Sequence, residues 1–146
     1  MSPRRSTTLI DDNATLTGLC AELAGSPYIS IDTEFIRDRT YWPRLCLVQV
    51  ANPDQARAID PLADGIDLSP LYDLLRDPSV VKVFHAARQD VEIFVRQAGD
   101  VPSPLFDTQI AAMVCGFGDS VGYETLVAKL AKARVDKSSR FTDWSL

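Results

Sequence analysis

Two carboxylates stand close together in the segment Ile31-Asp32-Thr33-Glu34-Phe35. In an extended strand, residues i and i+2 point to the same face, so Asp32 and Glu34 would lie with Cα atoms about 6.5–7 Å apart. Like charges this close raise each other's pKa unless a positive charge lies between them. A hard cation such as Mg²⁺ supplies that charge and commonly combines one or two carboxylates with substrate phosphates. Taken alone, such a pair more often marks a solvated acidic face than a metal site.

A third carboxylate follows in the segment Phe84-His85-Ala86-Ala87-Arg88-Gln89-Asp90, where a buried strand is expected to end and a helix to begin. Ligands of open α/β sheets gather at the carboxyl ends of strands, so Asp90 would face that crevice. The alternative is a favourable acid near a helix N-terminus. His85 is the only histidine in the chain, which excludes sites that need two. A lone histidine at a strand end is more often a hydrogen-bonded structural residue than a catalyst.

A second passage from strand to helix occurs at Phe106-Asp107-Thr108-Gln109. Aspartate is a favoured N-cap residue because its side chain accepts hydrogen bonds from the first free backbone N–H groups. We therefore favour a capping role for Asp107 over direct contact with a ligand.

Hydrophobic periodicity places these residues on a mixed set of elements. Alternation predicts strands over 28–34, 45–51 and 56–60, which are near enough in sequence to form an antiparallel meander. Strands over 80–84 and 105–107 follow, and helical spacing predicts helices over 14–24, 69–76, 86–98, 108–115 and 123–131. The expected fold class is α/β, with an antiparallel three-strand meander followed by parallel strands in one mixed sheet flanked by helices.

Cap residues predict where these helices begin and end. Asp12 or Asn13 would cap the first helix, and Ser69 would cap the second with Pro70 at its first position. Gly99 would end the third helix, because glycine readily adopts the left-handed conformation found there.

Composition bounds the class of protein. The chain has 146 residues, of which 46% are hydrophobic and 24% charged, as expected for one globular domain. Fifteen Lys and Arg against 20 Asp and Glu give a net charge of −5, which argues against a protein that coats nucleic acid with a basic face. The acidic excess is still compatible with nucleic-acid chemistry if some carboxylates hold metal ions.

Location is predicted from the cysteines and the absence of apolar runs. No run approaches the roughly 18–20 apolar residues that span a membrane, and Arg4-Arg5 precedes a polar segment rather than an export signal. The three cysteines form no CxxC pair, which excludes a disulfide framework or a four-cysteine zinc site in this chain. We read Cys20, Cys46 and Cys115 as small buried hydrophobic residues. A cytoplasmic protein with no membrane partner is expected.

Taken together, the segments stop being weak signals. In order along the chain, they are Ile31 to Phe35, Arg44-Leu45-Cys46-Leu47-Val48-Gln49, Val83 to Asp90, and Phe106 to Gln109. This series resembles the 3′–5′ exonuclease domain of ribonuclease D, in the DEDD superfamily with an RNase H-like fold. Asp136-Lys137-Ser138 and Thr142-Asp143-Trp144 are also similar to that family, so the resemblance extends from about Tyr28 to Leu146.

The resemblance implies a metal-dependent exonuclease that trims RNA from its 3′ end and releases 5′-mononucleotides, in the 3′ processing of tRNA or other structured RNA. It implies that Asp32, Glu34 and Asp90 are catalytic metal ligands. Two Mg²⁺ or Mn²⁺ ions about 3.5–4 Å apart would clamp the attacking water and the leaving oxygen. It also implies substrate-binding residues, of which the candidates are Thr33, Phe35, His85 and Asp107. Thr33 and Phe35 would hold the terminal nucleotide by backbone contact and base stacking.

One part of the family pattern is not found. The third motif, Tyr-x-x-x-Asp, is expected beyond Trp144, and the only tyrosine four residues before an aspartate is Tyr28, whose partner Asp32 belongs to the first motif. We therefore expect residues 1–146 to form a single exonuclease domain that is incomplete at its C-terminus, with three of four ligands. The alternative is a catalytically silent RNA- or protein-binding module of the same fold.

The expected partners are RNA 3′ ends, single-stranded or tRNA-like, with DNA as a second candidate. Protein partners are not predicted. Arg37, Arg39 and Arg44 follow the first motif and would either meet phosphates or form a solvated loop. Tyr41 and Trp42 would either stack on a base or pack the loop, and packing is favoured.

Overall fold

A computed structural model describes residues 9–37 and 39–137 of the chain. The elements run in the order β1 (Leu9–Ile10), α1 (Asn13–Leu23), β2 (Tyr28–Ile36), β3 (Arg44–Ala51), β4 (Ala56–Ile59), α2 (Ser69–Arg76), β5 (Val81–Phe84), α3 (Arg88–Ala98), β6 (Leu105–Asp107), α4 (Thr108–Val114) and α5 (Tyr123–Leu130). The predicted helices and strands are all present within two residues at each end. Only the two-residue strand β1 was not predicted, since two residues show no alternation.

The described strands form one sheet in the order β1-β4-β3-β2-β5-β6. β2, β3 and β4 pair antiparallel, whereas β5 pairs parallel with β2 and β6 pairs parallel with β5. The predicted fold class, a meander followed by parallel strands, is therefore confirmed. β2 lies inside the sheet and pairs with β3 from Ser30 to Ile36, whereas its pairing with β5 covers only Tyr28, Ile29 and Ser30.

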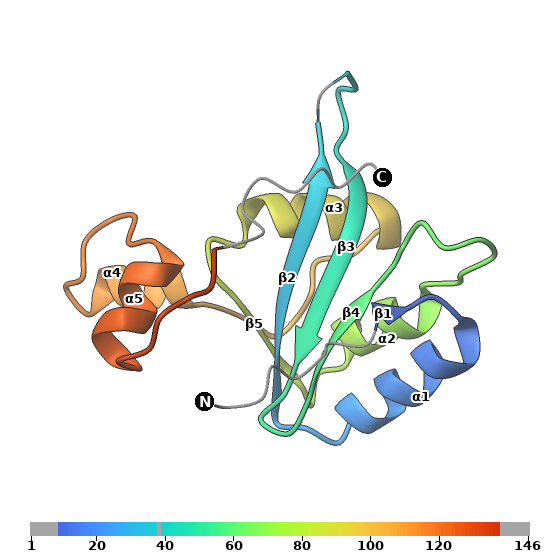
Figure 1. The fold of residues 1–146 in the computed structure, drawn as a ribbon, viewed down its shortest axis with the longest axis horizontal. Helices are drawn as coiled ribbons and strands as arrows, with labels where there is room; N and C mark the ends of the chain where they lie inside the picture. Colours follow the sequence, from blue (N-terminus) through green and yellow to red (C-terminus); the bar gives the residue numbers. More distant parts are fainter. Residues whose placement is uncertain (1–8, 38, 138–146) are drawn as a thin grey trace.

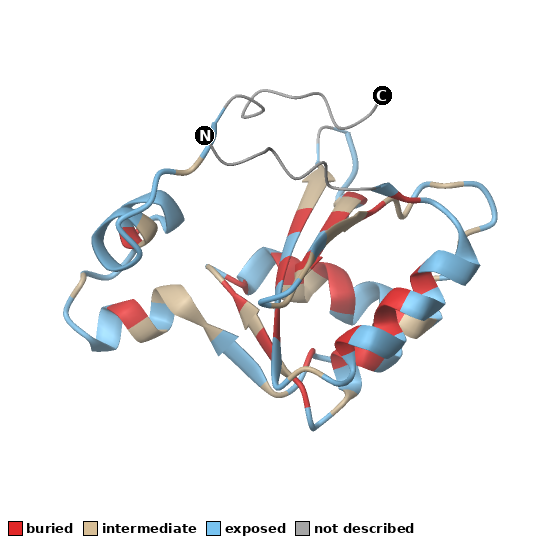
Figure 2. Cartoon of the chain, turned by 60° about the horizontal axis from the view of Figure 1, so that its bottom comes forward, coloured by how far each residue is buried: buried red, intermediate tan, exposed pale blue. Residues whose placement is uncertain are grey.

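Helices α1, α2 and α3 lie behind the sheet in Figure 1, and the main core fills the space between them. Figure 2 shows buried positions gathered on the sides of these helices that meet the sheet. β2 contributes Ile29 and Ile31 to this core, while α3 contributes Ile93 and Phe94. Within the described residues, no helix has the length and apolar character needed to cross a membrane.

Two helix starts differ from prediction. Asp12 caps α1 as expected, its side chain accepting from the Thr15 backbone N–H at 2.8 Å. The prediction for α2 was wrong: the N-cap is Leu68, and Ser69 instead donates to Asp67, which holds the preceding turn. α3 begins at Arg88 rather than at residue 86, because Ala86 has a φ of 56° and cannot belong to the helix.

The sequence did not indicate that Lys82 would be buried, and the burial predicted for Cys115 is wrong. Lys82 lies in β5 and is fully buried, and its Nζ donates to the backbone carbonyls of Asp77 and of Ser103. Burial lowers the pKa of Lys82, against the opposing effect of Asp77. Cys20 and Cys46 are buried as expected, but Cys115 is exposed because it follows α4, which lies away from the main core.

Helices α4 and α5 extend sideways from β6 (Figure 1); we call residues 108–130 the α4–α5 arm. The arm has a small core of its own, Ala112, Val121 and Leu126 with Phe117 against them. Several apolar side chains remain exposed on it, among them Ile110, Val114 and Leu130. The arm is thus joined to the sheet but adds little to the main core.

Candidate active site

The first two carboxylates share the face of β2 that points away from the main core. Ile29, Ile31 and Thr33 are buried on the helix side, so Asp32 and Glu34 lie on the open side. This confirms the alternation predicted from the sequence. A register shift follows directly: Glu34 pairs with Leu47 but Phe35 pairs with Leu45. Such a bulge increases the local twist of the strands just beyond the two carboxylates.

The third carboxylate approaches the same strand from α3. Asp90 is 7% exposed, and its Oδ1 accepts a hydrogen bond from the Thr33 hydroxyl. Thr33 stands between Asp32 and Glu34 in sequence, and its backbone N–H donates to Asp32 Oδ1 at 3.0 Å. One residue therefore links the strand pair to the helix carboxylate.

The three carboxylates disfavour one another's charge. Burial raises the pKa of Glu34, and repulsion from Asp32 and Asp90 raises it further. Burial also raises the pKa of Asp32, although the Thr33 N–H and the nearby His85 oppose this. Burial and then Asp32 raise the pKa of Asp90 to about 6, even though Thr33 donates to it. Among the described residues no Lys or Arg forms an ion pair with these three groups.

This donor set fits a hard divalent cation in its chemistry. Mg²⁺ and Mn²⁺ prefer oxygen ligands, and these carboxylates have no positively charged side chain paired with them. Within residues 9–37 and 39–137, however, no three His, Cys, Asp or Glu side chains are placed closely enough to hold one ion. The hydrogen bond from Thr33 holds Asp90 on the helix side of β2. The Thr33 hydroxyl donates to Oδ1, so the second oxygen of the Asp90 carboxylate is not engaged by that hydroxyl.

Asp107 organises the backbone beside this cluster. Its side chain caps α4 by accepting from the Gln109 N–H at 2.8 Å, which confirms the capping prediction. It also accepts from the N–H groups of Ala86 and Ala87, at 3.0 and 2.8 Å. Burial alone would raise the pKa of Asp107, but these backbone donors together lower it. Asp107 thus fixes the turn from β5 into α3, and its contact with substrate stays a prediction.

His85 is held on both sides of its ring. Nδ1 lies 2.8 Å from the Thr108 hydroxyl, and Nε2 lies 2.9 Å from the Val121 carbonyl, to which it donates. Its ring also meets that of Tyr123 edge-on, with centroids 5.7 Å apart. His85 therefore joins the sheet to the α4–α5 arm, as expected for a structural histidine. A contact with substrate stays a prediction.

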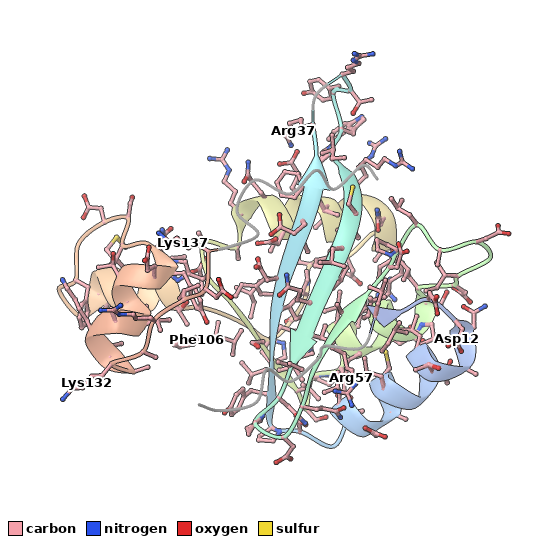
Figure 3. The ribbon with its side chains drawn as sticks, viewed as in Figure 1. Asp12, Arg37, Arg57, Phe106, Lys132 and Lys137 are labelled. Atoms are coloured by element: carbon pink, nitrogen blue, oxygen red, sulfur yellow. The ribbon has the colours of Figure 1, made fainter. Side chains whose placement is uncertain are left out.

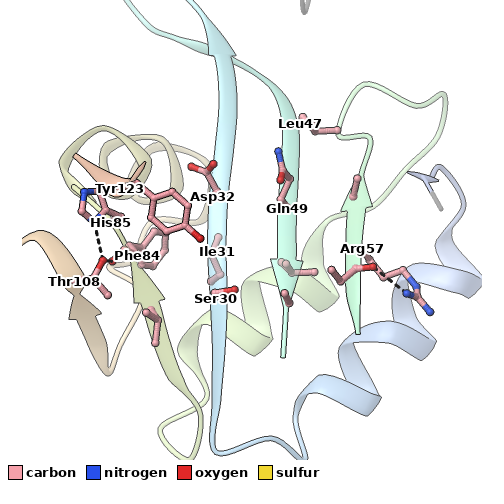
Figure 4. Close-up of a pocket in the computed structure, with 15 residues that line it drawn as sticks. Ser30, Ile31, Asp32, Leu47, Gln49, Arg57, Phe84, His85, Thr108 and Tyr123 are labelled. Atoms are coloured by element: carbon pink, nitrogen blue, oxygen red, sulfur yellow. Dashed lines mark hydrogen bonds between the residues drawn. The ribbon is translucent and has the colours of Figure 1, made fainter. Parts of the chain in front are cut away.

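A pocket of about 580 Å³ runs across the open face of the sheet. Figure 4 shows Asp32 at its centre, with His85, Thr108 and Tyr123 along one side and Gln49 and Arg57 along the other. The pocket thus joins one catalytic candidate to a groove wide enough for a small organic group. Glu34 and Asp90 are not among its lining residues.

Gln49 and Tyr123 line the pocket although their sequence positions predicted no role for them. Gln49 pairs with Asp32 across β2 and β3, and a polar residue inside the apolar run Leu45 to Ala51 was a signal for it. Tyr123 begins α5, and no pattern in the sequence indicated that it would approach His85.

Other candidates lie beside the pocket or outside the described residues. Phe35 is half-buried and packs against the main core, so its role in base stacking stays a prediction. Lys137 forms an ion pair with Glu124 of α5. Ser138, Arg140 and Thr142-Asp143-Trp144 lie outside the described residues, as do Arg4 and Arg5.

Comparison with known proteins decides the family. The profile of the 3′–5′ exonuclease family matches residues 7–145. The chain belongs to the 3′–5′ exonuclease family. The resemblance to ribonuclease D is also confirmed. Ribonuclease D of Jannaschia sp. (strain CCS1) is 65% identical over 134 residues, which cover 89% of this chain and 35% of that protein.

Solved structures agree with this exonuclease assignment. Escherichia coli RNase D, an exoribonuclease involved in structured RNA processing, superposes with a TM-score of 0.90 at 41% identity, covering 96% of this chain and 37% of that one. Brucella melitensis NrnC with bound Mg²⁺ superposes with a TM-score of 0.73 at 27% identity, covering 86% of this chain and 61% of that one. The exonuclease chain described here spans about a third of the length of its curated relatives.

Proposed function

We propose that this chain carries the catalytic carboxylates of a divalent-metal-dependent 3′–5′ exoribonuclease that releases 5′-mononucleotides from RNA 3′ ends, including those of tRNA or other structured RNA. The observation that carries the proposal is the cluster of Asp32, Glu34 and Asp90, three mutually repelling carboxylates beside a pocket. The same-family profile match and the ribonuclease D relatives support it. DNA is a second candidate substrate, and a cytoplasmic location remains part of the proposal.

In this mechanism Asp32, Glu34 and Asp90 are the residues that would hold the divalent metal, Mg²⁺ or Mn²⁺, with two ions expected. The metal would activate water and stabilise the leaving 3′ oxygen when bound. The Thr33 hydroxyl positions Asp90 by donating to its Oδ1. Asp32 opens onto the pocket, where His85 and Tyr123 form one wall against which a terminal nucleotide would lie.

Metal binding is tested without relying on turnover. Mg²⁺ or Mn²⁺ should raise the Tm of the chain, because a ligand that binds only the folded state stabilises it by mass action. Asp32→Ala should abolish most of this shift. Asp64→Ala, which removes an exposed aspartate outside the cluster, is the matched control and should keep it. Equal shifts in all three proteins would contradict the metal assignment.

Turnover is tested with single-stranded RNA labelled at its 5′ end. With Mg²⁺ or Mn²⁺, products should shorten progressively from the 3′ end, and Asp32→Ala should stop this. The same assay on a chain of the relatives' full length shows whether further residues are needed. A full-length protein that binds metal and RNA but leaves the RNA intact would instead be the silent binding module.

A further inference from the structure

The strands β2 and β3 continue past the carboxylates into a hairpin that rises beyond the rest of the sheet (Figure 1). We call Arg37, Arg39, Tyr41, Trp42 and Arg44 the hairpin surface. Arg37 comes three residues after Glu34, which is about 10 Å along an extended strand. The hairpin surface therefore begins outside the reach of a single nucleotide held at the carboxylates.

The hairpin surface concentrates positive charge on an acidic chain. Its three arginines are exposed, while the chain as a whole has a net charge of −5. Arg37 pairs with Glu92 at 3.1 Å. Among the described residues, no ion pair involves Arg39 or Arg44. No carboxylate in the part of the chain that the structure describes therefore neutralises these two guanidinium groups.

The two aromatic residues of the hairpin differ in their contacts: Trp42 contacts α3, whereas Tyr41 is largely exposed. Arg96 of α3 lies over the Trp42 ring, 4.0 Å from its centroid, so Trp42 contacts α3 although it is 41% exposed. Tyr41 meets Trp42 edge-on, with centroids 4.8 Å apart, but is itself 84% exposed. The face of Tyr41 is thus presented to solvent on a fixed support.

The support comes from the helix that carries Asp90. The Arg96–Trp42 contact and the Arg37–Glu92 pair both join the hairpin to α3. Figure 3 shows Arg37 at the base of the hairpin and nitrogen-bearing side chains gathered around it. The hairpin surface is therefore fixed in direction relative to the carboxylates, which lowers the entropy lost on binding.

We propose that the hairpin surface binds single-stranded nucleic acid upstream of the 3′-terminal nucleotide, with Tyr41 stacking on a base and Arg39 and Arg44 meeting phosphates. Aromatic faces and cations together are the features that hold single strands without reading sequence. The inference rests on the proposed function for its direction, since the terminal nucleotide would lie at the carboxylates. Base stacking and phosphate contacts do not depend on the 2′-hydroxyl, so RNA and DNA strands should bind alike there.

The test is binding in EDTA, where no turnover occurs. The probes are a fluorescein-labelled oligouridine about twelve nucleotides long, within the usual range of single-strand sites, and the matching oligothymidine. Fluorescence anisotropy of the probe should show that Tyr41→Ala weakens binding about tenfold, as expected for a lost stacking contact. Tyr41→Phe should keep the affinity. Tyr28→Ala removes another exposed tyrosine at the opposite end of β2 and should also keep it.

The charges are tested by salt dependence. Arg39→Gln should reduce the slope of log affinity against log salt by about 0.7, the value for one phosphate contact on a single strand. Lys132→Gln removes an exposed cation on the far side of the α4–α5 arm (Figure 3) and should leave the slope unchanged. Circular dichroism melts confirm that each variant is folded.

Three results would overturn the inference: no binding by the wild-type chain at low salt, equal loss in Tyr41→Ala and Tyr28→Ala, or an unchanged salt slope in Arg39→Gln. Because metal is absent, the outcome is separate from that of the proposed function. A chain that binds through Tyr41 but degrades no RNA would retain this surface and lose the catalytic assignment.

Discussion

Asp90 is a carboxylate kept in an unfavourable place. It is buried between α3 and β2, close to two other carboxylates, with the Thr33 hydroxyl as its side-chain hydrogen-bond donor. A buried charge without a cation costs free energy. Residues kept at such a cost commonly serve a site rather than the core. The free energy of unfolding should therefore decrease when the Asp90 carboxylate becomes ionised.

We predict that Asp90→Asn makes the metal-free chain more stable above pH 6. Its folded-state pKa of about 6 lies above the ordinary 3.8, so the stability from the protonated group is complete below pH about 4 and is lost as pH rises through 6. The variant should gain about 3 kcal/mol in free energy of unfolding at pH 8 and little at pH 4. Urea denaturation in EDTA across this range measures it. Asp64→Asn, which removes an exposed carboxylate outside the cluster, is the matched control. A stability difference between Asp90→Asn and the wild-type chain that did not change with pH would contradict the prediction.

We predict that Thr33→Val destabilises the chain by about 1–3 kcal/mol at pH 8, because it leaves the Asp90 carboxylate without its hydroxyl donor. Thr33→Ser restores the hydroxyl and should recover most of the loss. The valine variant should also titrate Asp90 at higher pH, since the Thr33 hydrogen bond lowers that pKa. Denaturation curves at several pH values measure both effects. Equal stability of the two variants would show that the hydrogen bond does not hold Asp90.

At the scale of elements, the position of α3 depends on a contact from another strand. Asp107 at the end of β6 accepts hydrogen bonds from the backbone N–H groups of Ala86 and Ala87, and so fixes the turn between β5 and α3. Ala86 has a positive φ of 56°, which costs a residue with a Cβ about 1–2 kcal/mol. The same turn sets where His85 and Asp90 lie.

We predict that Asp107→Ala lowers the free energy of unfolding by about 1–3 kcal/mol, because backbone donors lose their acceptor. Ala86→Gly added to it should return about 1 kcal/mol, since glycine adopts the left-handed conformation without a Cβ clash. Chemical denaturation of the single and double variants measures both steps. If Ala86→Gly recovers no free energy of unfolding, the positive φ of Ala86 does not cost the stability assigned to it.

The elements were predictable from local patterns, whereas contacts between them were not. The alternation of Ile29 and Ile31 with Asp32 correctly gave the face of β2, and Gly99, with a φ of 78°, ends α3 as expected. The start of α3 was predicted two residues early because Ala86 is a good helix former by type. Its conformation depends on Asp107, which is 21 residues away in sequence. Asp90 could likewise be identified as a candidate, but not its bond to Thr33.

At the scale of the whole molecule, the chain has two parts that differ in how many buried residues form their cores. The main core joins α1, α2 and α3 to the sheet, whereas the α4–α5 arm has three buried residues among those described. Local unfolding free energy follows the number of buried apolar contacts and the protection of hydrogen bonds. Composition could predict a globular chain, but not that Cys115 and Ile110 would lie exposed on an arm.

We predict that backbone amides of α4 and α5 exchange with deuterium much faster than those of β2 and β3. Opening the arm exposes only a small core, whereas opening the central strands exposes most of the main one. Hydrogen exchange followed by mass spectrometry of peptides measures the difference. The His85 bonds to Thr108 and Val121 cross this boundary, so His85→Ala should speed exchange in the arm and leave β3 unchanged. Uniform exchange in both regions would contradict the division.

The buried amine of Lys82 makes the rate of lysine acylation a measure of how often the sheet opens. Its Nζ is enclosed in β5 by two backbone carbonyls, whereas Lys129, Lys132 and Lys137 are exposed. An acylating reagent would therefore label the three exposed lysines at once and reach Lys82 only when β5 separates from the turn at Asp77. The slow labelling of one residue would then count how often the strand that leads to His85 comes open in the native protein.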